Sequence, residues 1–204
     1  MAKVQVVFHS TYGHVYLLAE QVAAGAREMG GTEVLLHQVP ETTPEDVLRA
    51  SGAWDARQGF AHVPVADPIQ LADADAIIVG TPTRFGNMSA QMRAFWDSTL
   101  QLWLTGALVG KIGSAFVATG SQHGGHETTI TSIWNTFCHQ GMLICGVPYS
   151  ETRLMAMDEI TGSSPYGAGT MSGVDGRRLP SENELAIART QGRHVATLAQ
   201  KMFG

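Results

Sequence analysis

The stretch KVQVVFHSTYGHVYLLAEQVAAGA, residues 3–26, decides the fold of this 204-residue chain. Its first six residues are a short, Val-rich apolar run, which is typical of a buried strand. From Tyr12 onward, apolar residues recur every three or four positions and predict a helix over residues 12–29, which ends at the Gly pair 30–31. Ser10 and Thr11 stand between the two. The stretch therefore predicts a strand that runs through a polar corner directly into a helix.

The same alternation continues along the chain. Further strands are predicted at residues 33–39, 74–82, 111–119 and 142–147, and further helices at residues 89–104, 127–140 and 181–203. Ser181 and Glu184 have the spacing of a capping box at the start of the last helix. The long segment 40–71 is rich in Pro and Gly, so we expect loop there with one short helix at residues 44–50.

Strands regularly separated by helices predict an α/β fold, in which right-handed crossovers join parallel strands and helices cover both faces of the sheet. Five strands favour the flavodoxin-like, doubly wound order. We expect residues 1–204 to form one domain of this kind. In such sheets ligands bind beyond the carboxyl ends of the strands, where the winding reverses. The loops after the first, third and fourth strands are therefore the candidate site.

Composition narrows the possible functions. The chain is 44% hydrophobic and 15% charged, and its net charge is −5. Scattered basic residues and an acidic balance argue against a nucleic-acid surface. No window approaches the roughly 18 to 20 apolar residues of a membrane span, and no signal peptide is apparent, so a cytoplasmic location is expected. The spacing of Cys138 and Cys145 fits neither a CxxC redox pair nor a zinc site, and both are expected to be reduced and mostly buried.

The corner after the first strand is suited to an anion. Unpaired N–H groups and the positive end of the helix dipole meet there, and Ser10 and Thr11 add hydroxyl donors. Simple capping of the helix by Ser or Thr explains the same residues. The chain has no GxxxxGK[ST] or GxGxxG motif, which leaves a monophosphate held by hydroxyls and amides without Lys or Arg.

Two later loops have a similar character. GTPTRFGNM, residues 80–88, combines Pro82 and Gly86 in a rigid turn whose N–H groups could follow the edge of a flat heterocycle. ATGSQHGGHETT, residues 118–129, is an open Gly-rich loop with hydrogen-bonding side chains. Each loop alone could be an ordinary turn. Three small, donor-rich loops at consecutive strand ends are much less likely to coincide by chance.

These residues resemble the WrbA-type NAD(P)H:quinone oxidoreductases, a family of flavodoxin-like proteins that bind FMN. The resemblance covers nearly the whole chain. It is carried by the motifs STYGHV (10–15), GTPTRFGNMS (80–89), ATGSQHGGHETTITS (118–132), HQGM (139–142), SPYGAGTMSG (164–173) and PSENELAIARTQGRHVA (180–196). PTRFGNM is the most specific of them. The segment with His123 and His126 departs from a fixed family pattern, because its length and composition vary among relatives.

The resemblance implies a set of FMN contacts. They are Ser10, Thr11, Tyr12, Gly13, His14 and Val15 at the phosphate, Pro82, Thr83, Arg84, Phe85, Gly86 and Asn87 along the ribityl chain and ring, and Thr119, Gly120, Ser121, Gln122, His123 and Gly124 at the far edge of the ring. It also implies that Tyr12 touches NAD(P)H, that His139 lies close to FMN, and that Trp103 walls the quinone pocket. Taken without the resemblance, His139 is typical of a solvated or a satisfied core histidine, and Trp103 is typical of packing in the core or at an interface.

The resemblance further implies the reaction. NADH or NADPH reduces FMN by hydride transfer and leaves, and a quinone then takes two electrons, without a covalent protein catalyst or a metal. His139 is a candidate for tuning FMN or donating a proton. A homotetramer is usual in the family, with pockets where subunits meet, and a dimer is the alternative state. Two other functions remain open from the sequence: a flavodoxin-type electron carrier and a redox-linked regulatory binding protein.

Overall fold

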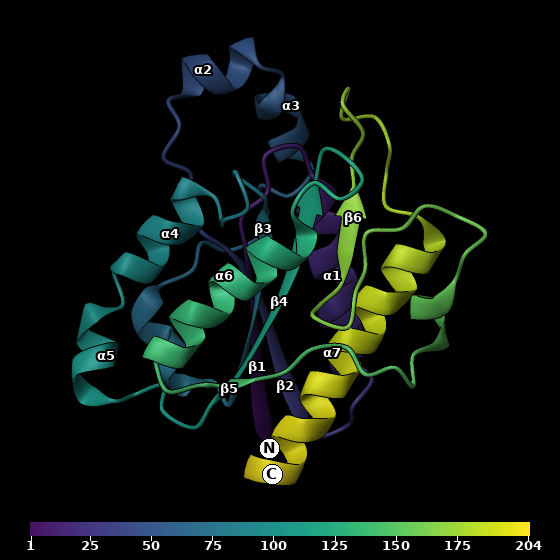
Figure 1. Ribbon diagram of the computed structural model, residues 1–204. Coiled ribbons are helices and arrows are strands. Elements are labelled where there is room, and N and C mark those ends of the chain that lie inside the picture. Colours follow the sequence, from purple (N-terminus) through teal and green to yellow (C-terminus); the bar gives the residue numbers. More distant parts are fainter.

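The computed structural model describes all residues, 1–204, and its centre is a parallel sheet (Figure 1). The main strands are β1 (Ala2–Phe8), β2 (Thr32–Gln38), β3 (Ala76–Pro82), β4 (Ile112–Thr119) and β5 (Leu143–Ile144), in the order β2-β1-β3-β4-β5. A sixth strand, β6 (Gly169–Met171), also pairs with β4. This order confirms the predicted flavodoxin-like topology, whose winding reverses between β1 and β3.

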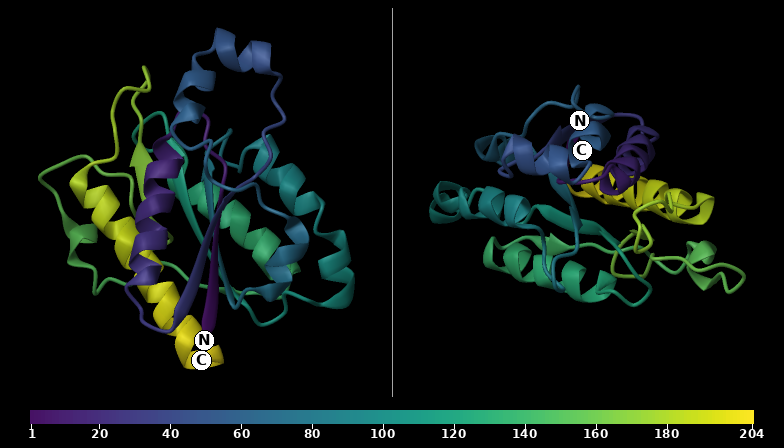
Figure 2. Two further views of the ribbon diagram at one scale, coloured as in Figure 1. Left: turned by 180° about the vertical axis from the view of Figure 1, so that it is seen from behind. Right: turned by 90° about the horizontal axis from the view of Figure 1, so that it is seen from above.

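Helices cover both faces of the sheet (Figure 2). On one face lie α1 (His14–Arg27) and α7 (Glu182–Phe203), and on the other lie α4 (Ala90–Asp97), α5 (Leu100–Thr105) and α6 (His126–His139). Two separate apolar clusters fill the layers, because successive strand residues such as Val6 and Val7 point to opposite faces. The Ser181–Glu184 capping box at the start of α7 is confirmed.

Helices α1 and α7 approach so closely that their backbones touch. A Cβ on Gly25 would collide with the carbonyl oxygen of Arg189, and a Cβ on Gly192 would collide with that of Val22. The contact is reciprocal: Gly25 of α1 faces Arg189, three residues before Gly192, and Gly192 of α7 faces Val22, three residues before Gly25. The two glycines permit this contact, and side chains further along both helices fill the core against the sheet.

The predicted helix 89–104 is wrong as a single element, since it breaks into α4 and α5. The Ser98 and Thr99 hydroxyls donate to the carbonyls of Phe95 and Trp96 at 2.6 and 2.7 Å. Hydroxyls that bond to nearby carbonyls compete with the helical ladder and bend or end it. The segment predicted as loop with one helix contains α2 (Glu45–Ala50) as expected, and in addition α3 (Ala53–Gln58) and the 3₁₀ helix η1 (Pro68–Asp73).

The predicted strand 142–147 is also corrected. Only Leu143 and Ile144 pair with the start of β4, and the Val147 N–H donates instead to the Pro165 carbonyl at 2.9 Å. The chain leaves the sheet, passes through the 3₁₀ helix η2 (Thr152–Met155), and returns as β6 beside the end of β4. The fifth position of the sheet is thus shared by two short strands.

Buried Gln191 of α7 bridges the gap between these two strands. Its amide donates to the Ser114 hydroxyl and the Ala115 carbonyl of β4, and accepts from the Ala168 N–H just before β6. The backbone of β4 is therefore satisfied where no strand lies beside it.

The two termini, the two cysteines and the length of the helices complete the description of the fold. Both termini lie at the end of the sheet from which β1 starts, away from the loop that joins β1 to α1 (Figure 1). Cys145 is buried as expected, and burial raises its pKa to about 11, but Cys138 is exposed. None of the helices, including the 22-residue α7, combines the length and apolarity needed to cross a bilayer.

Candidate flavin site

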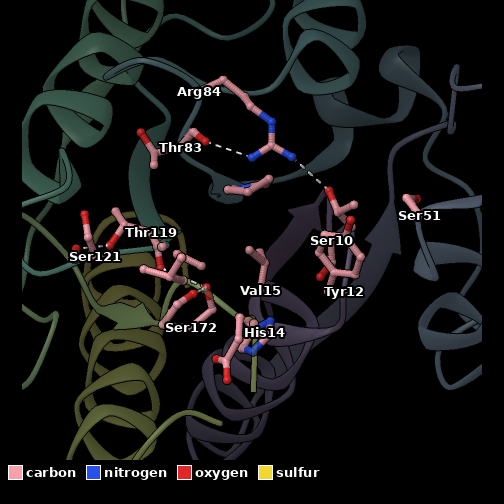
Figure 3. Close-up of a pocket in the computed structure, with 18 residues that line it drawn as sticks. Ser10, Tyr12, His14, Val15, Ser51, Thr83, Arg84, Thr119, Ser121 and Ser172 are labelled. Carbon is pink, nitrogen blue, oxygen red and sulfur yellow. Dashed lines mark hydrogen bonds between the residues drawn. The ribbon is translucent and has the colours of Figure 1, made fainter. Parts of the chain in front are cut away.

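A cavity of about 630 Å³ opens where β1, β3, β4 and β6 end (Figure 3). This size falls in the usual range for cofactor pockets. The lining residues are Ser10, Thr11, Tyr12, His14, Val15, Ser51, Pro82, Thr83, Arg84, Ala118, Thr119, Gly120, Ser121, Ser172, Gly173, Val174, Asp175 and Gly176. The cavity thus brings together residues from all three loops that the sequence singled out.

The corner after β1, residues 10–15, forms one end of the cavity. Gly13 caps α1 with φ of 94°, a conformation that favours glycine. The Ser10 hydroxyl accepts from the Gly13 N–H at 3.1 Å. The N–H groups of Thr11, Tyr12, His14 and Val15 have no acceptor within the chain. The corner therefore presents a cluster of free donors at the positive end of a helix.

Arg84 adds a positive charge to this corner. Its guanidinium donates to the Thr11 hydroxyl at 3.1 Å and to the Thr83 carbonyl at 2.8 Å (Figure 3). The expectation of a monophosphate site without Lys or Arg is therefore corrected. The sequence could not show this contact, because Arg84 and Thr11 are 73 residues apart.

Only some of the residues predicted to contact FMN in the loop after β3 face the cavity. Pro82, Thr83 and Arg84 line the cavity, whereas Phe85, Gly86 and Asn87 do not. Arg84 and Asn87 exchange backbone hydrogen bonds at 2.8 and 3.0 Å, which closes a tight turn. Phe85 stands at the tip of this turn with φ of 52° and a fully exposed side chain. A positive φ is uncommon for a non-glycine residue, so the turn holds this ring outward at a conformational cost.

In the loop after β4, too, only some of the predicted residues face the cavity. Thr119, Gly120 and Ser121 line the cavity. Gln122 and His123 line a second, smaller cavity instead, and Gly124 lines neither. The Gly-rich segment turns away after Ser121 to begin α6, with Gly125 at φ of 106° as its cap. Only the first half of the predicted loop therefore faces the cavity at the strand ends.

His126, a residue outside the predicted set, supports this loop from behind. Its Nε2 lies 3.0 Å from both the Thr119 hydroxyl and the Thr170 carbonyl. Because a carbonyl only accepts, the Nε2 carries the proton. Burial lowers the pKa of His126, which favours the neutral imidazole. His126 thus fixes the Thr119 side chain at the cavity wall.

The segment 172–176 after β6 is the main part of the wall that the sequence did not predict. The Ser172 N–H donates to the Thr119 carbonyl at 2.8 Å, which joins this segment to the end of β4. The Asp175 carboxylate accepts from the Arg177 N–H at 3.1 Å. The run MSGVDG, with its small residues, was the available signal, but β6 is only three residues long and shows no periodicity.

His139 and Trp103 do not reach the cavity of their own chain. His139 ends α6, whose first residue is His126, and fourteen helical residues span about 20 Å. It is exposed at the far end of that helix. Trp103 lies in α5 with 53% of its surface exposed. Within one chain, α6 therefore carries His139 away from the cavity, and its closeness to FMN stays a prediction that requires a neighbouring subunit.

The residues that are present fit FMN. The free N–H groups and hydroxyls of the corner suit a phosphate, and Arg84 supplies a counter-charge. The buried Nε2 of His14 has no partner in the chain, and burial lowers the pKa of this side chain. No atom lies within 4 Å of the position a Cβ would take on Gly13, so the space above the corner is open.

Together the sheet order and this cavity define a flavodoxin-like protein with a mononucleotide site at the switch point of its sheet. The chain belongs to the NADPH-dependent FMN reductase family, whose sequence profile matches residues 6–150.

Similarity to known proteins supports this family assignment. The chain is 60% identical over 202 residues to an NAD(P)H dehydrogenase (quinone) from Trichlorobacter lovleyi, with 99% of each chain covered. It is 56% identical to the protein of the same name from Methanosarcina acetivorans, with both chains fully covered. A WrbA-like flavodoxin from Agrobacterium tumefaciens has the same fold, with a TM-score of 0.66 at 25% identity over 98% of this chain and 99% of that one. The resemblance to the WrbA-type family is confirmed.

Proposed function

We propose that this chain is an FMN-dependent NAD(P)H:quinone oxidoreductase that reduces quinones to hydroquinones by two electrons. The observation that carries this function is the cavity at the strand ends, with a phosphate corner at one end. Its support is the 60% identity to a protein named NAD(P)H dehydrogenase (quinone). FMN supplies the ability to take up a hydride and to pass on two electrons.

The protein residues bind and orient. In this proposal Ser10, Thr11 and the free N–H groups of the corner hold the phosphate, and Arg84 neutralises its charge. The backbone around Thr83 and the segment 119–121 hold the remainder of the cofactor against the strand ends. Tyr12 is half exposed at the cavity, where it can contact an incoming nicotinamide. No side chain of the cavity is required as a nucleophile.

Quinone-dependent turnover tests this function. Purified yellow protein is expected to oxidise NADH or NADPH at about 10 per second with benzoquinone, a typical enzyme rate, and only slowly without it. Parallel double-reciprocal plots are expected, because the nicotinamide leaves before the quinone binds. FMN binding without quinone turnover would point instead to a one-electron carrier. A colourless protein that FMN cannot reconstitute would exclude both functions.

We also propose that residues 1–204 act as one cytoplasmic domain that assembles into a homotetramer. The support is an exposed apolar surface on and beside α5, formed by Leu100, Trp103, Leu104 and Val109, together with the fully exposed Phe85. Such surfaces are typical of protein interfaces. In a tetramer, Trp103 and His139 would reach the cavity of a neighbouring subunit, where Trp103 walls the quinone and His139 tunes FMN or donates a proton.

Trp103→Ala is expected to raise the KM for quinone by about tenfold, the effect of one lost aromatic contact, while the Kd for FMN stays nearly unchanged. His139→Ala is expected to slow reduction of FMN. Sedimentation velocity checks that both variants keep the oligomeric state of the wild type. A monomeric wild-type protein with full activity would contradict the shared site.

A further inference from the structure

We infer that Arg57 is a positioning residue for the phosphate corner and gives the protein much of its preference for FMN over unphosphorylated flavin. This inference rests on the proposed function, since it takes the corner as the phosphate site. Arg57 ends in a guanidinium that donates to the Ser10 carbonyl at 2.9 Å, although the two residues are 47 positions apart. Arg57 itself does not line the cavity.

The guanidinium is held firmly from several sides. It pairs with the Glu41 carboxylate at 3.1 Å, donates to the Gln38 side chain at 3.3 Å, and lies 5.3 Å from the centre of the Phe60 ring. Only 14% of the Arg57 side chain is exposed. Because these contacts and its burial hold the guanidinium, the Ser10 carbonyl meets a donor that is already fixed in place.

Glu41 is equally well anchored. Its carboxylate accepts from the N–H groups of Thr42 and Thr43, from the Gln91 amide at 2.7 Å, and lies 3.2 Å from the Nε2 of buried His9. These contacts lower the pKa of Glu41 against the opposing effect of burial. Glu41 therefore stays ionised and keeps Arg57 paired at neutral pH.

The contact with Ser10 matters because a peptide bond is planar and trans. The Ser10 carbonyl and the Thr11 N–H belong to one peptide unit and point in opposite directions. When Arg57 holds the carbonyl on one side, the Thr11 N–H must point to the other. That N–H is one of the donors without an acceptor in the chain, and Thr11 lines the cavity. Arg57 therefore aims a phosphate donor that it does not touch.

Ser10 is held at two points. Its hydroxyl accepts from the Gly13 N–H, and its carbonyl accepts from Arg57. Arg84 holds the neighbouring Thr11 hydroxyl from the loop after β3. Two arginines from different segments thus fix adjacent residues of the corner. Arg84 would contact the ligand directly, whereas Arg57 acts only through the backbone of Ser10.

The test compares the affinity of the apoprotein for FMN with its affinity for riboflavin, both measured by quenching of flavin fluorescence. A residue that positions the phosphate site affects only FMN, whereas a residue that supports the fold in general affects both flavins. Arg57→Gln is expected to raise the Kd for FMN by about tenfold, the effect of a lost hydrogen bond to a charged group, and to leave the Kd for riboflavin nearly unchanged. Arg49→Gln is the matched control. Arg49 pairs with Glu45 and lies over the Trp54 ring, its contacts do not include Ser10 or Glu41, and its loss is expected to change neither Kd.

Arg57→Lys provides a second test that does not depend on the stability of Arg57→Gln. Lysine keeps the charge but lacks the fork that serves Glu41 and Ser10 together. A smaller rise in the Kd for FMN, again without a change for riboflavin, is expected. An unchanged ratio of the two Kd values in the folded Arg57 variants would overturn the inference. A wild-type protein that binds both flavins equally would instead overturn the proposed phosphate corner itself.

Discussion

Thr11→Asp is expected to weaken FMN binding by at least about 100-fold, because a carboxylate would face the phosphate dianion across a few ångströms. Thr11 lines the cavity, its N–H is free, and its hydroxyl lies 3.1 Å from Arg84. The new carboxylate would also pair with Arg84 and so neutralise the cation that lines the cavity beside the corner. Purified protein is expected to be nearly colourless. Titration of the apoprotein with FMN, followed by flavin fluorescence, gives the Kd.

Thr11→Ala is the control for this change. It removes the hydroxyl and its contact with Arg84 but adds no charge, so a loss of about tenfold or less is expected. Riboflavin, which lacks the phosphate, is expected to bind the Thr11→Asp variant about as well as it binds the wild type. If Thr11→Asp binds FMN with wild-type affinity, the phosphate lies elsewhere in the cavity.

Gly192→Ala is expected to lower the free energy of unfolding by about 3 kcal/mol, near the upper end of ordinary overpacking effects. The added Cβ would collide with the Val22 carbonyl of α1, which is backbone and cannot turn aside. Alanine favours a helix over glycine by about 1 kcal/mol, so the loss from the clash exceeds this gain. Urea unfolding of the apoprotein, followed by far-UV circular dichroism, measures the difference.

Gly25→Ala tests the other half of the same contact and is expected to cost a similar amount, because its Cβ would meet the Arg189 carbonyl. Gly30→Ala is the control. No atom lies within 4 Å of a Cβ at Gly30, so its stability is expected to stay within about 0.5 kcal/mol of the wild type. Equal stability of the Gly192→Ala and Gly30→Ala variants would mean that the two helices separate at little cost.

The sequence predicted the parts of the fold that depend on local periodicity. Val15, Leu18 and Val22 mark one face of α1, and that face is buried as expected. The strand order followed from the alternation of elements and the chirality of crossovers. Short elements carried no such signal. β6 has three residues, and its place beside β4 depends on Gln191 and on the return of the chain near Pro165.

The site was predictable to the level of its loops but not of its contacts. Residues at the end of a strand or within two positions of it, such as Ser10, Thr83 and Thr119, line the cavity because strand ends meet at one edge of a parallel sheet. Three or four residues further on, the direction of each loop depends on backbone angles. Phe85 at φ of 52° and Gly125 at φ of 106° turn the chain away, and no composition pattern gave these angles.

The contacts of the site that the sequence did not predict are mainly between residues far apart in the chain. Arg84 and Arg57 reach the corner over 73 and 47 residues, and each contact depends on how segments far apart in the chain pack together. His139 shows the converse. A motif match predicted that it lies near FMN, but α6 carries it away from the cavity of its own chain, so this contact depends on a neighbouring subunit that one sequence does not describe.

The position of the two termini has a practical consequence. Both lie together at the end of the sheet opposite the corner after β1 (Figure 1). A peptide tag, a fused reporter domain or a covalent tether to an electrode can therefore be attached at either terminus and still leave the mouth of the cavity facing the solution. Immobilised subunits would keep that mouth toward the dissolved quinone and nicotinamide, which is the orientation that a bioelectrode or a flow reactor requires.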